Sequence, residues 1–493
     1  MAAERRPNIL LIHSDQHRHD CVGAAGLRPD IATPHLDALA AGGALFDHAF
    51  CTIPICTPAR ASLMTGAWPT THGSFCIPSA EIDRAARREL PLLTRLLADA
   101  GYRVAWTGKY HQELEESPGP QHGIEEFVSA WNYHAWRKEQ GIPPVERPHG
   151  YFGDPDTACP PDKSPLAWQA DNVIRQIEER APSAGSEQAP SAGSGQAPSA
   201  GSGQAGNTPF FVRWDPPEPH LPCNPTGPFA ERFANAEIPP WTSFPDPLAG
   251  KPAAQRRQLK IWGVEDWTWE QWLPTVRLYH AVIAEMDHHI GRVLARLDEL
   301  GLADNTLVIY STDHGDYCGG HGQIDKHFNM YDDVTRVPLI LRWPGRVPAG
   351  ARPDAFASNS VDIAATILDA AGIEKPDTFA GHSLLRMAAD PAFQPREHAF
   401  CQYFGTESGA CSIRMLRGPR YKFVYHPVED THEFYDLEND PGELRNEIGN
   451  PALAPEIARL KTALFETMQA HGDRLANSWT RLELCGNGDI HSV

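Results

Sequence analysis

The segment from residue 56 to residue 66, Cys-Thr-Pro-Ala-Arg-Ala-Ser-Leu-Met-Thr-Gly, combines a thiol, a guanidinium group and two helix signals. Pro58 suits the first turn of a helix and Gly66 suits its end, so a short helix is predicted to begin near Cys56. The thiol would lie at the positive end of the helix dipole, an anion-binding position, with Arg60 one turn further on. A thiol in such a place has a lowered pKa and can act as a nucleophile. The alternative interpretation is a buried cysteine at a helix start.

Ionisable side chains also follow four short apolar runs that lie far apart in the chain. They are Asp15-Gln16, Lys109 with His111, Asp215 with His220, and Asp313-His314. If the runs are parallel strands, these side chains meet in the crevice at the carboxyl edge of the sheet. Carboxylate, amide and imidazole groups together suit a divalent cation. A single Asp after a strand is more often a turn former or a helix cap, but the paired pattern favours a metal site.

The elements that must position these residues alternate between strand and helix. Strands are predicted at residues 9–12, 102–106, 210–212, 307–310 and 337–343. Apolar residues at helical spacing predict helices that end at Gly101 and Gly301, and a further helix over 361–371. Short apolar strands alternating with helices predict an α/β fold: a large, mostly parallel sheet sandwiched by helices.

The C-terminal part has a different pattern. Polar and aromatic runs at 421–425 and 433–437 predict antiparallel strands, and a final helix is predicted at about 452–470. We therefore expect a catalytic α/β domain over residues 1–390 and a smaller C-terminal α+β domain with an antiparallel sheet over residues 391–493. Residues 181–204 are three copies of an octapeptide rich in Pro, Ala, Gly and Ser, which predicts a flexible insertion.

The composition limits the classes of function. The chain has 493 residues with 43 Lys and Arg against 63 Asp and Glu, and this net charge of −20 argues against nucleic-acid binding. No apolar run approaches the ~18 residues of a membrane span. The ten cysteines include no C-x-x-C pair, which argues against a structural zinc site. The apolar run at 9–12 is too short for a signal peptide, so we expect a cytoplasmic location.

The motif Cys-x-Pro-x-Arg followed by Ala-Ser-Leu-x-Thr-Gly resembles the signature of the formylglycine-dependent (type I) sulfatases, of the alkaline phosphatase superfamily. The similarity extends to Asp15-Gln16, Gly108-Lys109-Tyr110-His111, Pro219-His220, Thr312-Asp313-His314-Gly315 and Lys326-His327. Tyr435-Asp436-Leu437-Glu438-Asn439-Asp440-Pro441 is similar to the C-terminal signature of the family. The resemblance covers about residues 6–450 and implies an alkaline phosphatase-like sheet.

The resemblance implies one divalent cation, held by Asp15, Gln16, Asp313, His314 and the modified Cys56. Many members of the family carry Asp-Asp after the first strand and Asp-Asn after the late one. The Asp-Gln and Asp-His of this chain also resemble phosphonate monoester hydrolases and choline-sulfatase-like enzymes. Calcium is the cation that the family implies, and the imidazole ligand leaves room for Mn²⁺ or another softer ion; Mg²⁺ is a further possibility.

The resemblance also implies the roles of the catalytic residues. A maturation enzyme would oxidise Cys56 to formylglycine, whose hydrate attacks sulfur. Arg60 would steady the diol, and Lys109 would bridge the diol and the sulfate oxygens. His111 would accept the proton in the elimination of sulfate, while His220 and Lys326 would bind sulfate and assist the leaving oxygen.

The expected function is hydrolysis of a small sulfate ester, with the sugar, aryl and choline types all open. One alternative is a phosphonate monoester or phosphodiester hydrolase with the same site, although the Gly-Lys-x-His motif favours sulfatases. The other is a catalytically silent binding protein. The oligomeric state stays open. His13, His17 and His19 are expected to orient the metal loop rather than bind zinc. Four tryptophans form either an aromatic wall for the substrate or an ordinary cluster: Trp262, Trp267, Trp269 and Trp272.

Overall fold

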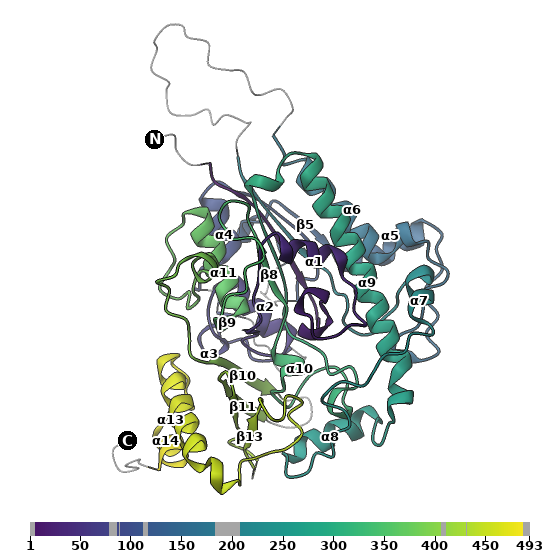
Figure 1. Ribbon diagram of the computed structural model, residues 1–493. Coiled ribbons are helices and arrows are strands. Elements are labelled where there is room, and N and C mark those ends of the chain that lie inside the picture. Colours follow the sequence, from purple (N-terminus) through teal and green to yellow (C-terminus); the bar gives the residue numbers. More distant parts are fainter. Residues whose placement is uncertain are drawn as a thin grey trace, which may run out of the picture.

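The computed structural model describes residues 5–77, 86–87, 89–111, 117–182, 208–405, 411–429 and 431–486. A seven-stranded sheet lies at the centre of the molecule (Figure 1). Its strands in spatial order are β2 (Ala44–Leu45), β8 (Leu339–Arg342), β7 (Thr306–Thr312), β1 (Asn8–Ser14), β6 (Phe210–Asp215), β4 (Arg103–Gly108) and β5 (Glu126–Ser129). The predicted repeat insertion lies outside the described residues, except for its first two positions.

The sheet is mostly parallel, as predicted. Strand β1 pairs in parallel with β6 and β7, and β4 pairs in parallel with β6 and β5. Strand β8 forms at the predicted place, but it runs antiparallel to both β7 and β2. The connection from β7 to β8 contains a 3-10 turn (Gly320–Gly322) and the four-residue helix α10 (Asp332–Thr335), but no long helix. Because no long crossover helix returns the chain to the other edge, the next strand runs back beside β7.

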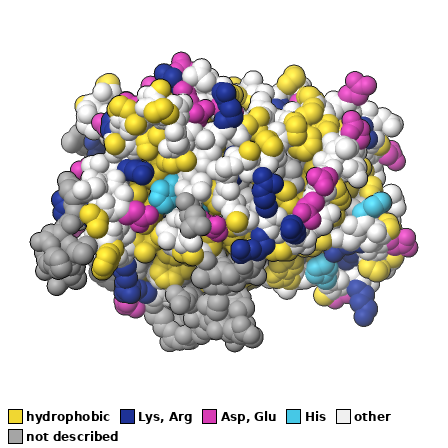
Figure 2. Space-filling model, turned by 90° about the horizontal axis from the view of Figure 1, so that it is seen from below, with side chains coloured by type: hydrophobic (Ala, Val, Ile, Leu, Met, Phe, Trp, Pro, Cys, Tyr) yellow, Lys and Arg dark blue, Asp and Glu magenta, His cyan; other side chains and the backbone are white. Residues whose placement is uncertain are grey.

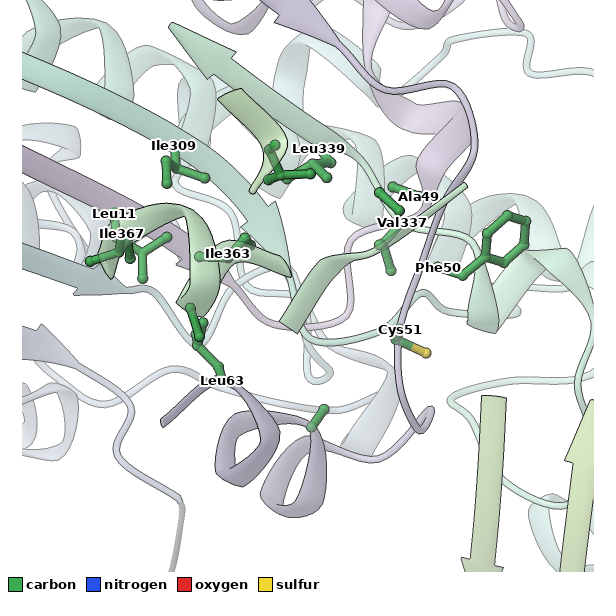
Figure 3. Packing of buried hydrophobic residues seen from close by; sticks show 14 of the residues in the cluster. Leu11, Ala49, Phe50, Cys51, Leu63, Ile309, Val337, Leu339, Ile363 and Ile367 are labelled. Atoms are coloured by element: carbon green, nitrogen blue, oxygen red, sulfur yellow. The ribbon is translucent and has the colours of Figure 1, made fainter. Parts of the chain in front are cut away.

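Helices cover both faces of the sheet because side chains alternate along each strand. Ile9 and Leu11 of β1 face one layer, and Leu10 and Ile12 face the other. The first layer consists of α2 (Cys56–Thr65), α4 (Leu93–Asp99), α11 (Asn359–Ala371) and α12 (Leu384–Ala389). The second consists of α1 (Pro34–Ala41), α6 (Pro165–Glu178) and α9 (Trp269–Glu299). Figure 3 shows the first layer, where Leu11 and Ile309 lie near Ile363 and Ile367 of α11.

The C-terminal part forms the expected second sheet. The strands β10 (Ala399–Gly405), β11 (Cys411–Arg417), β12 (Tyr421–Tyr425) and β13 (Glu433–Asp436) are antiparallel in that order. Helices α13 (Ala454–Ala470) and α14 (Ser478–Cys485) pack beside it (Figure 1). Cys401 and Met415 of this sheet belong to the same apolar cluster as Leu11 of β1, so a continuous core joins the two sheets.

Shorter elements complete the described part of the chain. They are β3 (Ala49–Phe50) paired with β9 (Ala357–Ser358), α3 (Pro69–His72), α5 (Tyr133–Glu139), α7 (Gly227–Phe233) and α8 (Ala253–Trp262). None of the helices in the described ranges has both the length and the apolar composition needed to cross a bilayer. On the face shown in Figure 2, basic side chains are interspersed with acidic and apolar ones.

Candidate active site

Helix α2 begins at Cys56, as the sequence predicts, and its thiol faces the ends of two neighbouring strands. Cys56 Sγ lies 3.6 Å from Asp15 Oδ1, at the end of β1, and 3.2 Å from His314 Nε2, just after β7. One potential ligand atom from each of Asp15, Cys56, Asp313 and His314 lies within 4.8 Å of the others. All four side chains are buried. The convergence expected from the strand ends is therefore present.

His314 directs its Nε2 atom toward this group. Its Nδ1 donates to the carbonyl oxygen of Gly315 at 2.8 Å, which leaves Nε2 beside Cys56 to hold either a proton or a cation. Burial lowers the pKa of His314, but the negative charges of Asp313 and Cys56 outweigh it and raise the pKa to about 9. The surroundings thus favour a positive charge at this nitrogen. Two carboxylates and an imidazole fit a divalent cation, which would take the place of the proton.

Arg60 is completely buried and joins three aspartates at three strand ends. Its Nε donates to Asp313 Oδ2 at 2.9 Å, its Nη1 to Asp215 Oδ2 at 2.7 Å and its Nη2 to Asp15 Oδ2 at 3.0 Å. Arg213 also donates to Asp215, at 2.6 and 2.7 Å. Arg60 therefore fixes the carboxylates that surround Cys56, because its planar fork has a donor for each of them.

Lys109 and His111 approach the same point from the end of β4. Lys109 Nζ lies 2.5 Å from Asp15 Oδ2, and its backbone N–H donates to the carbonyl oxygen of Asp215 at 2.7 Å. The His111 side chain is within hydrogen-bonding reach of the Cys56 thiol. His111 Nδ1 is buried without a hydrogen-bond partner in the described residues, so this ring has a nitrogen available.

His220 and Lys326 form a directly hydrogen-bonded pair at the site. His220 Nδ1 donates to the carbonyl oxygen of Leu221 at 2.7 Å, so its Nε2 accepts from Lys326 Nζ, also at 2.7 Å. Lys326 Nζ lies 2.9 Å from Asp325 Oδ1 and donates to Gln16 Oε1 at 3.1 Å. The two expected sulfate-binding side chains are therefore in direct contact, and Gln16 lies beside them.

The electrostatic environment favours an anion at position 56. Burial raises the pKa of the Cys56 thiol, but the charges of Lys109, Lys326 and His314 and the hydrogen bond from His111 hold it well below its usual range. The sequence pattern predicts such a shift from the helix dipole, whereas these side chains supply it in the folded protein. The same arrangement would stabilise an oxyanion bound next to residue 56.

Three acidic residues of the site have no role predicted from the sequence. Asp215 is expected only as one of the converging strand ends, and the structure places it between Arg60 and Arg213. Asp316 lies behind Gln16, and Asp325 pairs with Lys326. The available signal was weak, because Asp316 and Asp325 merely lie close to Asp313 and Lys326 in the sequence.

The remaining sequence candidates lie outside the metal-binding group. His17 Nδ1 contacts the Tyr310 hydroxyl at 2.5 Å and its Nε2 contacts the Cys21 carbonyl oxygen at 2.9 Å. The tryptophan-rich segment 262–272 forms an apolar cluster in which Trp272 is fully buried, which favours the ordinary-cluster interpretation. Cys318 is a packed residue of that cluster. His327 contacts the Tyr403 hydroxyl at 3.4 Å through its Nδ1.

A cavity of about 970 Å³ opens from the site between α5 and α6. Lys109 and His220 line its inner end, together with the half-buried carboxyl group of Glu218. Lys138 and Arg147, both exposed, line its outer part. Its size is in the range of small-molecule sites.

Comparisons with known proteins find similar sequences and a similar fold. Residues 7–373 match the family model described as "Sulfatase", and residues 319–470 match "N-sulphoglucosamine sulphohydrolase, C-terminal". The chain is 26% identical to "Uncharacterized sulfatase YidJ" of Escherichia coli K12, over 94% of this chain and 87% of that protein. It is 27% identical to "Choline-sulfatase" of Rhizobium meliloti, over 95% and 87% of the two chains. The fold matches the phosphonate monoester hydrolase of Agrobacterium radiobacter with a TM-score of 0.75 and 24% identity, over 94% of this chain and 96% of that one.

Proposed function

Because the chain belongs to the sulfatase family and is a sulfuric ester hydrolase, we propose that it acts through a formylglycine made from Cys56 by a maturation enzyme. The observation that carries this proposal is the position of Cys56. It opens α2 and faces Asp15 and His314, and the charges of Lys109 and Lys326 act on it. The hydrated aldehyde would place two hydroxyl groups where the thiol now lies.

The side chains around residue 56 have complementary tasks in this reaction. Lys109 and Lys326 hold the sulfate oxygens and offset the negative charge that develops on them. One hydroxyl group of residue 56 gives its proton to the Asp15 carboxylate, whose Oδ1 lies 3.6 Å from the thiol sulfur, and the oxygen bonds to sulfur while the bond from sulfur to the alcohol oxygen breaks. The pair of His220 and Lys326 delivers a proton to that departing oxygen. His111 then accepts the proton of the second hydroxyl as the carbon–oxygen bond to sulfate breaks and the aldehyde returns, ready for a new water.

The cation of this proposal would be held by Asp15, Gln16, Asp313, His314 and the modified residue 56. When bound there, it supplies the Lewis acidity that lowers the pKa of the attacking hydroxyl. We propose Ca²⁺ first, because the sulfatase family implies it and most of the ligand atoms are oxygens. Mn²⁺ is an alternative because His314 adds a nitrogen, and Mg²⁺ is a further one. Arg60 keeps two of the carboxylates in place through the ion pairs described above.

We propose that the alcohol part of the substrate is a small sugar bound in the 970 Å³ cavity. The cavity begins at Lys109 and His220, on which the sulfate group would lie, and it is far larger than a choline group requires. Glu218 and Gln169 line it with polar atoms suited to hydroxyl groups, and Leu166 and Pro217 supply apolar surface for a ring. Aryl and choline sulfates are the competing substrates in a test panel.

A phosphonate monoester or phosphodiester is the second candidate substrate class. The Asp-Gln and Asp-His pairs at the metal site favour it, since they resemble the phosphonate hydrolases. Sulfur and phosphorus oxyanions share size and geometry, so the pocket would accept both. The ratio of kcat/KM for an aryl sulfate and the matching aryl phosphonate decides between them.

The nucleophile is tested by Cys56→Ala. We expect loss of turnover with an unchanged circular dichroism spectrum, because only the reacting group is removed. Mass spectrometry of the wild-type peptide that contains residue 56 should show an aldehyde in place of the thiol. Cys485→Ala, at the end of α14, is the matched control and should retain full activity. An active Cys56→Ala enzyme would contradict the proposal.

A further inference from the structure

Asp316 is a buried carboxylate for which the reaction described above has no use. Its Oδ2 accepts a hydrogen bond from Gln16 Nε2 at 2.5 Å. Its Oδ1 accepts from two backbone N–H groups, of Cys318 at 2.7 Å and of Asp325 at 3.1 Å. The side chain is fully buried, so it is held in one orientation. One carboxylate therefore connects Gln16 at the end of β1 with the loop that carries Lys326.

The two partners of Gln16 determine which way its amide points. A carboxylate only accepts hydrogen bonds and an ammonium group only donates them. The NH₂ group must therefore face Asp316, and the oxygen must face Lys326, whose Nζ is 3.1 Å from Oε1. A flipped amide would set oxygen against oxygen and donor against donor at both ends. Only the observed orientation presents an oxygen to the site.

We propose that Asp316 is a positioning residue that holds the Gln16 amide with its oxygen toward Lys326 and the cation site. The proposal rests on the proposed cation-dependent function, since an amide binds a cation only through its oxygen. The proposal also explains why Asp316 accompanies the Asp-Gln pair of this chain. An amide at position 16 needs a hydrogen-bond acceptor on the side away from the cation site, whereas a carboxylate at position 16 would need none.

The variant Asp316→Asn tests this inference without a change of shape. The asparagine oxygen should take the place of Oδ1, because two backbone N–H groups point at it. Its NH₂ group then faces Gln16 and forces that amide to flip, which turns an NH₂ group toward the cation. We expect the affinity of the metal-free protein for Mn²⁺ or Ca²⁺, measured by titration calorimetry, to fall roughly 10- to 100-fold.

A second substitution should reverse the effect. In the double variant Asp316→Asn with Gln16→Glu, the new carboxylate accepts from the asparagine NH₂ group and presents its other oxygen to the site. We expect cation affinity to return close to the wild-type value, and turnover of an aryl sulfate to rise above that of Asp316→Asn. Gln16→Glu alone sets two carboxylates against each other and should not match the double variant. Asp287→Asn, a buried aspartate that binds the backbone N–H groups of His35 and Leu36, is the control for loss of a buried charge.

Loss of cation affinity in Asp316→Asn, followed by its recovery in the double variant, distinguishes a positioning role from a general structural role. Unchanged affinity in Asp316→Asn, or a double variant as weak as Asp316→Asn, would overturn the proposal. If Asp316→Asn does not fold, a folded double variant with restored affinity still supports it, and an unfolded one overturns it. A wrong choice of nucleophile would show in the Cys56 variants and would leave this cation-binding cycle unaffected.

Discussion

Individual residues of the site are buried charges that depend on one another. Arg60 has no exposed surface and serves Asp15, Asp215 and Asp313 at once. Removal of one member of such a group leaves the remaining charges unpaired in the interior. The resulting loss of stability is larger than the stabilisation that the intact ion pair provides. Each charged side chain near Cys56 therefore depends on the oppositely charged side chains next to it for its stability in the interior.

Glu218 is the carboxyl group that should make this site sensitive to pH. It lines the cavity with Lys109 and His220, and burial raises its pKa to about 7, against smaller opposing effects of hydrogen bonds that include one from Gln169. Above pH 7 it becomes negative next to the place of an anionic ester. We expect kcat/KM to fall there through Coulombic repulsion, and the Glu218→Gln enzyme to lose this decline.

The same residue predicts a change in stability. The pKa in the folded state lies above the ordinary value of 4.5, so between pH 4.5 and 7 the folded protein binds more protons than the unfolded chain. The free energy of unfolding should therefore decrease as pH rises through this window, by at most about 1.4 kcal/mol per pH unit, and level off above it. Urea titrations at several pH values should show a steeper decrease in wild type and in Glu139→Gln, an exposed control on α5, than in Glu218→Gln. Equal slopes in all three proteins would refute the assignment.

The sequence indicated the site residues that lie at a recognisable start of a helix or end of a strand. Cys56 is flanked by helix signals, and Asp15, Lys109 and Asp313 each follow an apolar strand. Asp316 carries no such signal, because its role comes from Gln16, which is 300 positions away in the chain. Only the fold reveals a contact of that kind.

At the level of elements, periodicity predicted the type and place of segments better than their direction. Strands β1, β4, β6 and β7 and helices α9 and α11 form where apolar spacing places them. The direction of β8 was not predictable from its own residues, since it depends on the connection from β7. Helix α9 also begins earlier than the apolar stripe, at Trp269, because Thr268 and Gln271 form a capping box.

The end of helix α2 offers a test of how tightly the element that carries Cys56 is held. Gly66 closes α2 with a φ of 62°, and a Cβ there would lie 2.1 Å from Cδ1 of Phe379. Gly66→Ala should lower the free energy of unfolding by roughly 2–5 kcal/mol, the left-handed backbone and the displaced ring both contributing.

Gly301 is the matched control, since it closes α9 with a φ of 66° and a Cβ added to it would meet no atom of the described residues within 4 Å. Gly301→Ala should cost only the backbone contribution, about 1–2 kcal/mol. Urea unfolding monitored by circular dichroism gives both values. Equal losses in the two variants would mean that contact with Phe379 is unimportant.

At the scale of the whole molecule, buried charges join the two sheets. Lys422 of β12 has no exposed side-chain surface and lies 2.5 Å from Asp332 Oδ1 and 2.7 Å from Glu443 Oε1. It also donates to the carbonyl oxygen of Met330 at 3.1 Å. Asp332 and Met330 belong to the segment between β7 and β8 that also carries Lys326. The second sheet therefore supports the loop that completes the site, and the apolar core continues from one sheet into the other.

This connection predicts that the protein unfolds as one cooperative unit and that Lys422→Met destabilises all of it. The methionine keeps the volume but leaves Glu443 without its cation and Asp332 with only the longer contact to Arg417 at 3.4 Å, which should cost about 3–5 kcal/mol. Arg420→Ala, which removes ion pairs of a half-exposed side chain on the same sheet, should change the midpoint little. We expect a single urea transition, followed equally by aryl sulfate turnover, tryptophan fluorescence and circular dichroism. Its midpoint should lie at a lower urea concentration in Lys422→Met than in wild type. A variant that lost the second sheet in a separate, earlier transition while it kept its turnover would show that the site does not depend on this support.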